Sequence, residues 1–189
     1  MVNPINIIES EIVKVATKYL KTKEIPDNRG WYDKAFEKAM QKVGWRFGQH
    51  WCAYFMELVW KEAYNKYFDN KEQKYTTIST PTISGVFNNT EIDRKSTLNL
   101  LTKLCSGNSQ KTFRNFQKSG IFKTGKEPRV GAAAVYKYGI TTGHTVACVT
   151  EVTFNGFHSI EGNVSNKVIC RSHLANEPNL LGFIYPVEF

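Results

Sequence analysis

The fold class is decided in residues 131–162, whose sequence is GAAAVYKYGITTGHTVACVTEVTFNGFHSIEG. From Gly131 onward the apolar residues follow a period of two in short runs bounded by turn residues, which is typical of β-strands. The runs are AAAVYKY, HTVACVTEV, GFHSIEG, KVICRSH and LGFIYPV. Between two of them lies Asn155-Gly156, a pair that favours a two-residue hairpin with a type I′ turn. The sequence therefore predicts an antiparallel sheet of about five strands in the C-terminal part.

Upstream of this stretch the apolar residues recur three and four positions apart, as in amphipathic helices. We expect helices over residues 6–22 and 31–43, and a third and stronger helix over residues 51–67. The inward-facing stripe of the third helix comprises Phe55, Met56, Val59, Trp60 and Ala63. Helices followed by an antiparallel sheet define an α+β fold. A chain of 189 residues suits one domain over residues 1–189.

The intervening residues 68–128 carry a weaker pattern, with local helical periodicity near 96–105 and 110–118. Residues 94–129 hold nine Lys or Arg and one acid, Glu127, so this segment alone carries +8, the formal net charge of the whole chain. One interpretation is a solvated helical face. The other is a contact surface for an anionic polymer.

Composition excludes several classes of protein. No apolar run approaches the ~18 residues of a membrane-spanning helix. The N-terminal residues 1–20 lack the apolar centre of a signal peptide, so we expect synthesis in the cytoplasm without export by that route. The cysteines form no CxxC pair, which argues against a structural zinc site and favours free thiols over two disulfides. They are Cys52, Cys105, Cys148 and Cys170.

Cys52 stands at the start of the third predicted helix. The first backbone N–H groups of a helix lack internal partners, and the helix dipole is positive there. Both effects favour a thiolate, which makes a cysteine nucleophilic, and the same N–H groups can stabilise an oxyanion. The alternative is a buried, inert cysteine on an apolar helix.

His144 follows a glycine and opens a predicted strand. An imidazole with a pKa near neutrality could take a proton from Cys52 and later protonate a leaving amine. The alternative is a histidine at a sheet edge. His50 lies only two residues before Cys52, which makes it a less suitable base, and no polar sequence partner marks His158 or His173.

Glu161 and Asn163 flank Gly162 at the end of the next predicted strand. A hairpin centred on Asn155-Gly156 would pair positions 161 and 163 with 150 and 148, and position 144 with 167. The side chains of His144, Glu161 and Asn163 then share one face of the sheet. A flat ladder, however, leaves Glu161 and Asn163 roughly 13–20 Å from His144 along the strand. Twist, a bulge or a longer turn would have to close that gap.

Three stretches together resemble one family of cysteine hydrolases. VGWRFGQHWCAYFMELVWKEA, residues 43–63, resembles the nucleophile helix of the CHAP (cysteine, histidine-dependent amidohydrolase/peptidase) family, in which a WCA-type tripeptide begins the helix. GHTVACVTEVTFNGFHSIEGNVSN, residues 143–166, is similar to its GH…EGN element, and GFIYP to its closing strand. The match covers residues 20–66 and 120–187 and leaves 68–119 unaligned, so we treat about 68–128 as a basic insertion.

The resemblance implies a papain-like fold and cleavage of amide bonds in peptidoglycan, by an N-acetylmuramoyl-L-alanine amidase or by an endopeptidase of the stem peptide or cross-bridge. Cys52 would attack the carbonyl carbon, and His144 would act first as base and then as acid. Glu161 would orient the imidazole, and Asn163 would be an additional polar partner or take the place of Glu161.

The same resemblance implies an oxyanion hole formed by the Cys52 backbone N–H and one preceding side chain, for which Gln49 is the candidate. Three aromatic residues could line the substrate cleft, although core packing is an alternative use for at least one of them. They are Trp45, Trp51 and Tyr54.

The chain departs from the family at two places. Some members bind calcium through carboxylates in the ten residues before the cysteine, but residues 42–51, KVGWRFGQHW, contain no acid. We therefore expect no calcium at that place. We also expect no zinc, because a zinc site would use Cys52 as a ligand, and we expect no cofactor. The Pro-Gly-Asp sequence that usually precedes the first strand is replaced by PRVG at residues 128–131.

Two other classes of function stay open. One is a binding or structural module of a phage particle or secretion machine, with a weak or latent site. The other is an acyl transferase or deamidase that uses the same nucleophile. The expected partners are peptidoglycan and, through residues 94–129, an anionic wall polymer, with neither nucleic acid nor membrane insertion. A wall-lysing enzyme without an export signal, such as an endolysin, would reach the wall through a holin, a secretion apparatus or a virion.

Overall fold

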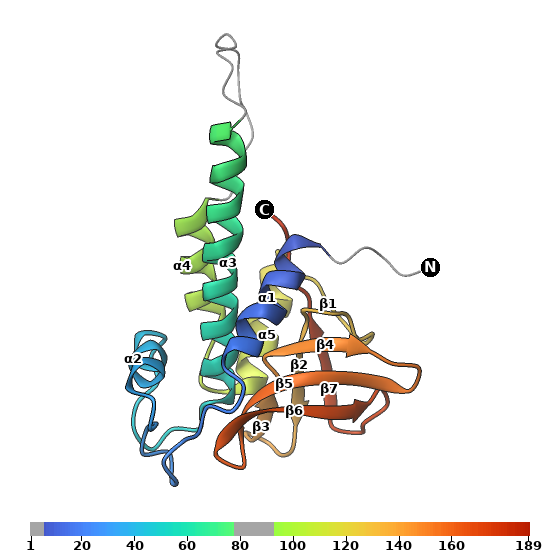
Figure 1. Cartoon of the computed structure of the whole chain (residues 1–189). Helices are drawn as coiled ribbons and strands as arrows, with labels where there is room; N and C mark the ends of the chain where they lie inside the picture. The colour runs from blue at the N-terminus through green and yellow to red at the C-terminus, as the bar shows by residue number, and fades with distance from the viewer. Residues whose placement is uncertain (1–5, 78–92) are drawn as a thin grey trace.

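The computed structural model describes residues 6–77 and 93–189, and within them the chain forms five helices and two antiparallel sheets, as the α+β prediction requires (Figure 1). The helices are α1 (Ile7–Lys18), α2 (Lys34–Lys42), α3 (Cys52–Thr77), α4 (Arg94–Leu104) and α5 (Ser109–Ser119). Residues 1–5 of the N-terminal segment considered for a signal peptide, and residues 78–92 of the predicted insertion, lie outside the described residues. No helix in the described part combines the length and apolarity needed to cross a bilayer.

The seven strands of the described ranges form a four-stranded sheet, in the order β1-β7-β2-β3, and a three-stranded sheet, in the order β4-β5-β6. The strands are β1 (Thr124–Gly125), β2 (Ala133–Lys137), β3 (Gly143–Thr145), β4 (Cys148–Val152), β5 (Gly156–Val164), β6 (Lys167–Leu174) and β7 (Leu180–Ile184). Figure 1 shows the strands gathered beside the helices, with α3 as the long central helix.

The prediction of one sheet of about five strands was wrong. The run HTVACVTEV divides into β3 and β4, because its middle residues bond to strands of both sheets. The Val146 N–H donates to Ala134 O at 2.9 Å in one direction, and the Ala147 N–H donates to Ile160 O at 3.2 Å in the other. The chain therefore passes from the first sheet to the second at this point. An uninterrupted apolar run cannot reveal such a crossing, because both sheets bury the same kind of residue.

The predicted type I′ turn at Asn155-Gly156 was also wrong. The Thr153 N–H donates to Gly156 O at 2.9 Å, so the loop residues are Phe154 and Asn155, and neither Asn155 nor Gly156 has the positive φ of that turn. A bulge after Val149 also shifts the register of β4 on β5. Positive φ at two successive loop residues occurs instead between β5 and β6, at Ser165 (49°) and Asn166 (58°).

Helix α3 is surrounded by other elements over its first half. The predicted stripe is confirmed, since Phe55, Met56, Val59, Trp60 and Ala63 are fully buried. Residues on other faces of the helix are buried as well, among them Ala53, Leu58 and Tyr64. A helix that is apolar all round belongs inside a core. Packing thus fixes α3, and with it the position of its first residue, Cys52.

The predicted insertion contributes to the main hydrophobic core. Leu101 and Leu104 of α4 and Phe116 of α5 are buried in the same cluster as the α1 and α3 side chains. Arg94, at the start of α4, also forms ion pairs with Asp69 and Glu72 on α3. The two helices that the sequence placed only by local periodicity are thus integral to the packing around α3.

Candidate active site

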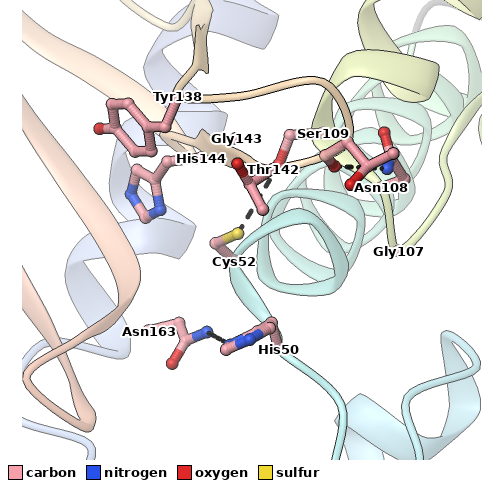
Figure 2. Close-up of a pocket in the computed structure, with 11 residues that line it drawn as sticks. His50, Cys52, Gly107, Asn108, Ser109, Tyr138, Thr142, Gly143, His144 and Asn163 are labelled. Atoms are coloured by element: carbon pink, nitrogen blue, oxygen red, sulfur yellow. Dashed lines mark hydrogen bonds between the residues drawn. The ribbon is translucent and has the colours of Figure 1, made fainter.

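Cys52, His144 and Asn163 lie together in a pocket of about 390 Å³ at the N-terminal end of α3 (Figure 2). Its wall is built by four separate parts of the chain: the start of α3 with the residues before it, the start of α5 with the residues before it, the strand β3 with the loop that precedes it, and the end of β5. The remaining lining residues are His50, Gly107, Asn108, Ser109, Tyr138, Thr141, Thr142 and Gly143.

Cys52 is the first residue of α3, and 5% of its surface is exposed. Burial acts to raise the pKa of its thiol. The hydrogen bond and charge of His144, together with hydrogen bonds from the Thr145 backbone and the Ser109 side chain, outweigh burial and hold that pKa below its ordinary value. The sulfur at this helix terminus is therefore biased towards thiolate.

His144 lies in β3, opposite Tyr136 of β2, and its Nε2 is 2.8 Å from Glu161 Oε2. With Nε2 bound to the carboxylate, Nδ1 is the ring nitrogen left for Cys52. Burial acts to lower the pKa of His144, but the Cys52 thiolate and the Glu161 carboxylate raise it to about 9. At neutral pH this geometry favours a thiolate paired with an imidazolium.

Glu161 is fully buried in β5, and its two oxygens bind different histidines. Oε2 accepts from His144, while Oε1 accepts from Ser159 at 2.8 Å and pairs with Nε2 of His173 on β6. Burial raises the pKa of this carboxyl, yet the hydrogen bonds and charges of His144 and His173 lower it far below its usual range. The carboxylate therefore stays charged and can hold the His144 ring in place.

Asn163 is near His50 and is not the hydrogen-bond partner of His144. It follows Gly162 in the bulge of β5, has a φ of 63°, and donates from Nδ2 to His50 Nδ1 at 3.3 Å (Figure 2). A Cβ at Gly162 would clash with the rings of Trp51 and Phe55, so the bulge lies directly against the start of α3. The structure thus pairs His144 with Glu161, while Asn163 lines the pocket beside His50.

The other residues singled out from the sequence lie outside the pocket lining. Gln49 is exposed, and its Oε1 accepts from the Arg46 N–H at 2.9 Å, which closes a tight turn before α3. Trp45 and Trp51 are fully buried and pack around Trp31. Tyr54 is half-buried behind the wall, with its ring against Gly107, where a Cβ would lie 2.6 Å from the Tyr54 hydroxyl.

The sequence pointed to neither Ser109 nor the loop residues 138–142 as parts of this site. Ser109 Oγ lies 3.8 Å from Cys52 Sγ, although the two are 57 positions apart. Asn108 is the N-cap of α5, a residue type that marks helix starts, but this signal says nothing of which element lies opposite. His173 was set aside as well. A regular hairpin through Ser165-Asn166 would pair position 173 with 158 and turn His173 away from Glu161. The bulge between Glu161 and Val164 shifts the register by one residue, so that His173 pairs with Phe157 and shares the face of Glu161.

The described residues contain no group of three or more His, Cys, Asp or Glu side chains arranged to hold a metal ion. All four cysteines belong to those residues and none forms a disulfide, which agrees with the expectation of free thiols. The chemistry that the pocket can offer with its own groups is nucleophilic attack by a thiolate, assisted by an oriented imidazole.

Comparisons of the chain with protein-family models, with curated proteins and with solved structures found no match. The resemblance to the CHAP family accordingly rests on the motifs quoted above. The geometry of Cys52, His144 and Glu161 is an observation that does not depend on that resemblance.

Proposed function

We propose that the protein is a cysteine-dependent hydrolase that cleaves an amide bond of peptidoglycan and has a papain-like fold. The observation that carries this proposal is that Cys52, at a helix start, and His144, on a strand, line one pocket, while the buried Glu161 of the other sheet binds His144. A nucleophile at a helix N-terminus, packed against antiparallel strands that hold the histidine, is the arrangement implied by the CHAP resemblance. That resemblance also supplies the substrate class.

The reaction follows from the charges of the resting pair. The Cys52 thiolate attacks the amide carbonyl carbon, and the negative charge that develops on the oxygen is stabilised by the Cys52 backbone N–H at the start of α3. The C–N bond breaks as the His144 imidazolium gives its proton to the leaving amine. A water molecule, deprotonated by His144, then attacks the thioester. The acid is released and the thiolate–imidazolium pair is restored.

Glu161 acts through His144 in this scheme. Its buried carboxylate keeps Nδ1 directed at the sulfur and stabilises the imidazolium that forms at each proton transfer. Asn163, which binds His50, is assigned to the part of the cleft that His50 lines. No metal or cofactor takes part in these steps.

The test is mass spectrometry of the products from purified peptidoglycan treated with wild type, Cys52→Ala and Cys170→Ala. Cys170 is an exposed thiol on β6 and serves as the matched control. We expect soluble products from wild type and Cys170→Ala and none from Cys52→Ala. Free stem peptides would identify an amidase, and severed stems or cross-bridges an endopeptidase. Full activity of Cys52→Ala would refute the proposal.

An anionic wall polymer is the proposed partner of the basic segment 94–129. Lys111, Arg114 and Lys118 are exposed on α5, the helix that begins at the pocket wall. Changing all three to Gln should weaken binding to isolated walls and flatten its dependence on salt, because screening acts on exposed charges. Removing the same charge from α2, by K34Q with K38Q and K42Q, is the control that should bind as wild type does.

The basic surface also favours the second candidate, a wall-binding module with a latent site. Tight wall binding without any product from wild type, on walls of several chemistries, would support that alternative. Transfer of the acyl group to an added amine, in place of hydrolysis, would identify an acyl transferase. We infer action at the cell wall in either of the first two cases.

A further inference from the structure

We propose that Ser109 is a further catalytic residue, whose hydroxyl donates a hydrogen bond to the Cys52 sulfur and stabilises the thiolate that attacks the substrate. This inference rests on the proposed function only in taking Cys52 as the nucleophile. It assigns part of the catalytic centre to the segment that the sequence left unaligned, and it does so through contact with the reacting atom.

The contact itself is the first argument. Ser109 is 5% exposed, lines the same pocket as Cys52, and has its Oγ 3.8 Å from Cys52 Sγ (Figure 2). Either atom could donate while the sulfur carries a proton. Once His144 has taken that proton, the sulfur can only accept, so the hydroxyl must be the donor. Hydrogen bonds to ionised groups are stronger than those between neutral groups, so the contact favours the charged state.

The second argument is that Ser109 is held in place from both sides. On one side, the Asn108 side chain accepts from the Lys111 N–H at 2.9 Å and donates to Thr141 O at 3.0 Å. On the other, the buried Gln110 side chain donates to Gly139 O and Thr142 O, both at 2.9 Å. These bonds fasten the start of α5 to the loop that leads into β3 and His144. The hydroxyl is therefore positioned relative to both members of the catalytic pair.

The third argument is electrostatic. Cys52 is the first residue of α3 and Ser109 is the first residue of α5, so the positive ends of two helices meet at the sulfur. The titratable side chains that face Cys52 across the pocket are His50, Tyr138 and His144. Among the described lining residues there is no carboxylate, and Glu161, which lies outside the lining, is bonded to His144.

A purely structural role makes a different prediction. Serine is common in the first turn of helices, and a buried serine that only completes the packing of α5 would affect unfolding without affecting the thiol. The decisive quantity is therefore the ionisation of Cys52, measured independently of any wall substrate.

The experiment is alkylation of the folded full chain with iodoacetamide between pH 4 and 9, with the Cys52 peptide quantified by mass spectrometry. Ser109→Ala should move the midpoint of Cys52 alkylation upward by about one pH unit, which is about tenfold less thiolate below the midpoint. Ser109→Thr, which keeps the hydroxyl, should retain the wild-type midpoint. Ser119→Ala, at the other end of α5, is the matched control and should leave the midpoint unchanged.

Ser109→Gly provides a second hydroxyl-free variant, because glycine is tolerated near helix starts, and it keeps the test valid if Ser109→Ala does not fold. An unchanged midpoint in either folded variant would overturn the assignment. One outcome would refute the hydrolase and leave the role of Ser109 supported. In it, the wild-type midpoint lies below that of an ordinary thiol and shifts in the Ser109 variants as expected, but peptidoglycan yields no products. If wild type releases products from peptidoglycan but the Ser109 variants show no shift of the midpoint, the hydrolase proposal would stand and the catalytic role of Ser109 would be refuted.

Discussion

Cys52, at the pocket end of α3, and Cys148, in β4 near the crossing between the two sheets, are both buried thiols, yet their surroundings give them opposite chemistry. At Cys148 burial dominates and raises the pKa to about 12, with the neighbouring Cys170 adding to the shift and a backbone hydrogen bond at Ile160 opposing it. At Cys52 the hydrogen bond and charge of His144 overcome burial and lower the pKa.

The difference between the two thiols shows which surroundings keep a buried cysteine protonated and which favour its thiolate. Burial alone keeps a thiol protonated, and Cys105, whose pKa is raised by burial and by the charge of Glu57, is a second example in the same protein. At Cys52 a helix N-terminus and an imidazole that is hydrogen-bonded to a carboxylate lower the pKa of the thiol instead. Each of the following substitutions, and the change of pH, removes or weakens one of the interactions that distinguish Cys52 from Cys148.

The largest effect is expected from replacing the two thiols in turn. Cys52→Ala should reduce product release from peptidoglycan by at least about 10³-fold, because the nucleophile is lost. Cys148→Ala should keep the activity and lower the free energy of unfolding by about 1–2 kcal/mol, because it leaves a small cavity. Product assays and urea unfolding measure the two losses. Equal activity of the two variants would mean that the contrast has no catalytic meaning.

The next largest effect is expected from His144→Ala, which removes the cause of the contrast and leaves the sulfur in place. The Cys52 pKa should rise towards that of a buried thiol, and the rate of amide cleavage should fall about 10²–10⁴-fold, since both the base and the acid are gone. Turnover of peptidoglycan and alkylation of Cys52 at pH 7 are the measurements. A variant that is still alkylated at the wild-type rate would show that the helix N-termini alone ionise the thiol.

A smaller effect is expected from pH. The reactive ion pair exists above the lowered pKa of Cys52 and below the raised pKa of His144, about 9. Below this window the thiol regains its proton, and above it the imidazolium loses the proton that the leaving amine needs. Activity should therefore be bell-shaped, with an alkaline limb near pH 9 that belongs to the coupled pair. An alkaline limb near the ordinary histidine pKa, about 6.5, would contradict the pairing.

The smallest effect is expected from His173→Phe, which keeps the stacking on Phe157 but removes the hydrogen bond to Glu161. The carboxylate should then hold His144 less firmly, with a fall of about tenfold in kcat and an alkaline limb at lower pH. His158→Phe, on the same sheet and bonded to Ser172, is the control and should alter neither. A loss of stability without a change in the pH profile would assign His173 a structural role alone.

Local patterns were sufficient to predict the helices and to place Cys52 at the start of α3, but not to divide the strands between two sheets. The stripes of α1 and α3 are set by residues three and four positions apart, and Ile8, Ile12 and Val15 are buried as their spacing predicts. The place of Cys52 at the start of α3 follows from the same local pattern. These features depend on neighbours in the chain, which a sequence displays directly.

Features that depend on distant segments were missed or incomplete. Ser109 reaches Cys52 only because α5 packs against the core and is bonded to the loop before β3. The second partner of Glu161, His173, required the register of β5 on β6, which the bulge between Glu161 and Val164 sets. Gln49 was placed by its proximity in sequence, but its side chain closes a turn outside the pocket.

The contact between His144 and Glu161 shows most clearly what the sequence alone could not predict. The sequence by itself determined the α+β class, the residue types and the order in which Cys52, His144 and Glu161 follow one another. Within a single flat sheet those residues would stand far apart along the strands. Only the tertiary structure decided their contact. The chain changes sheets at Val146 and Ala147, so β3 and β5 belong to different sheets, and His144 Nε2 comes within 2.8 Å of Glu161 Oε2.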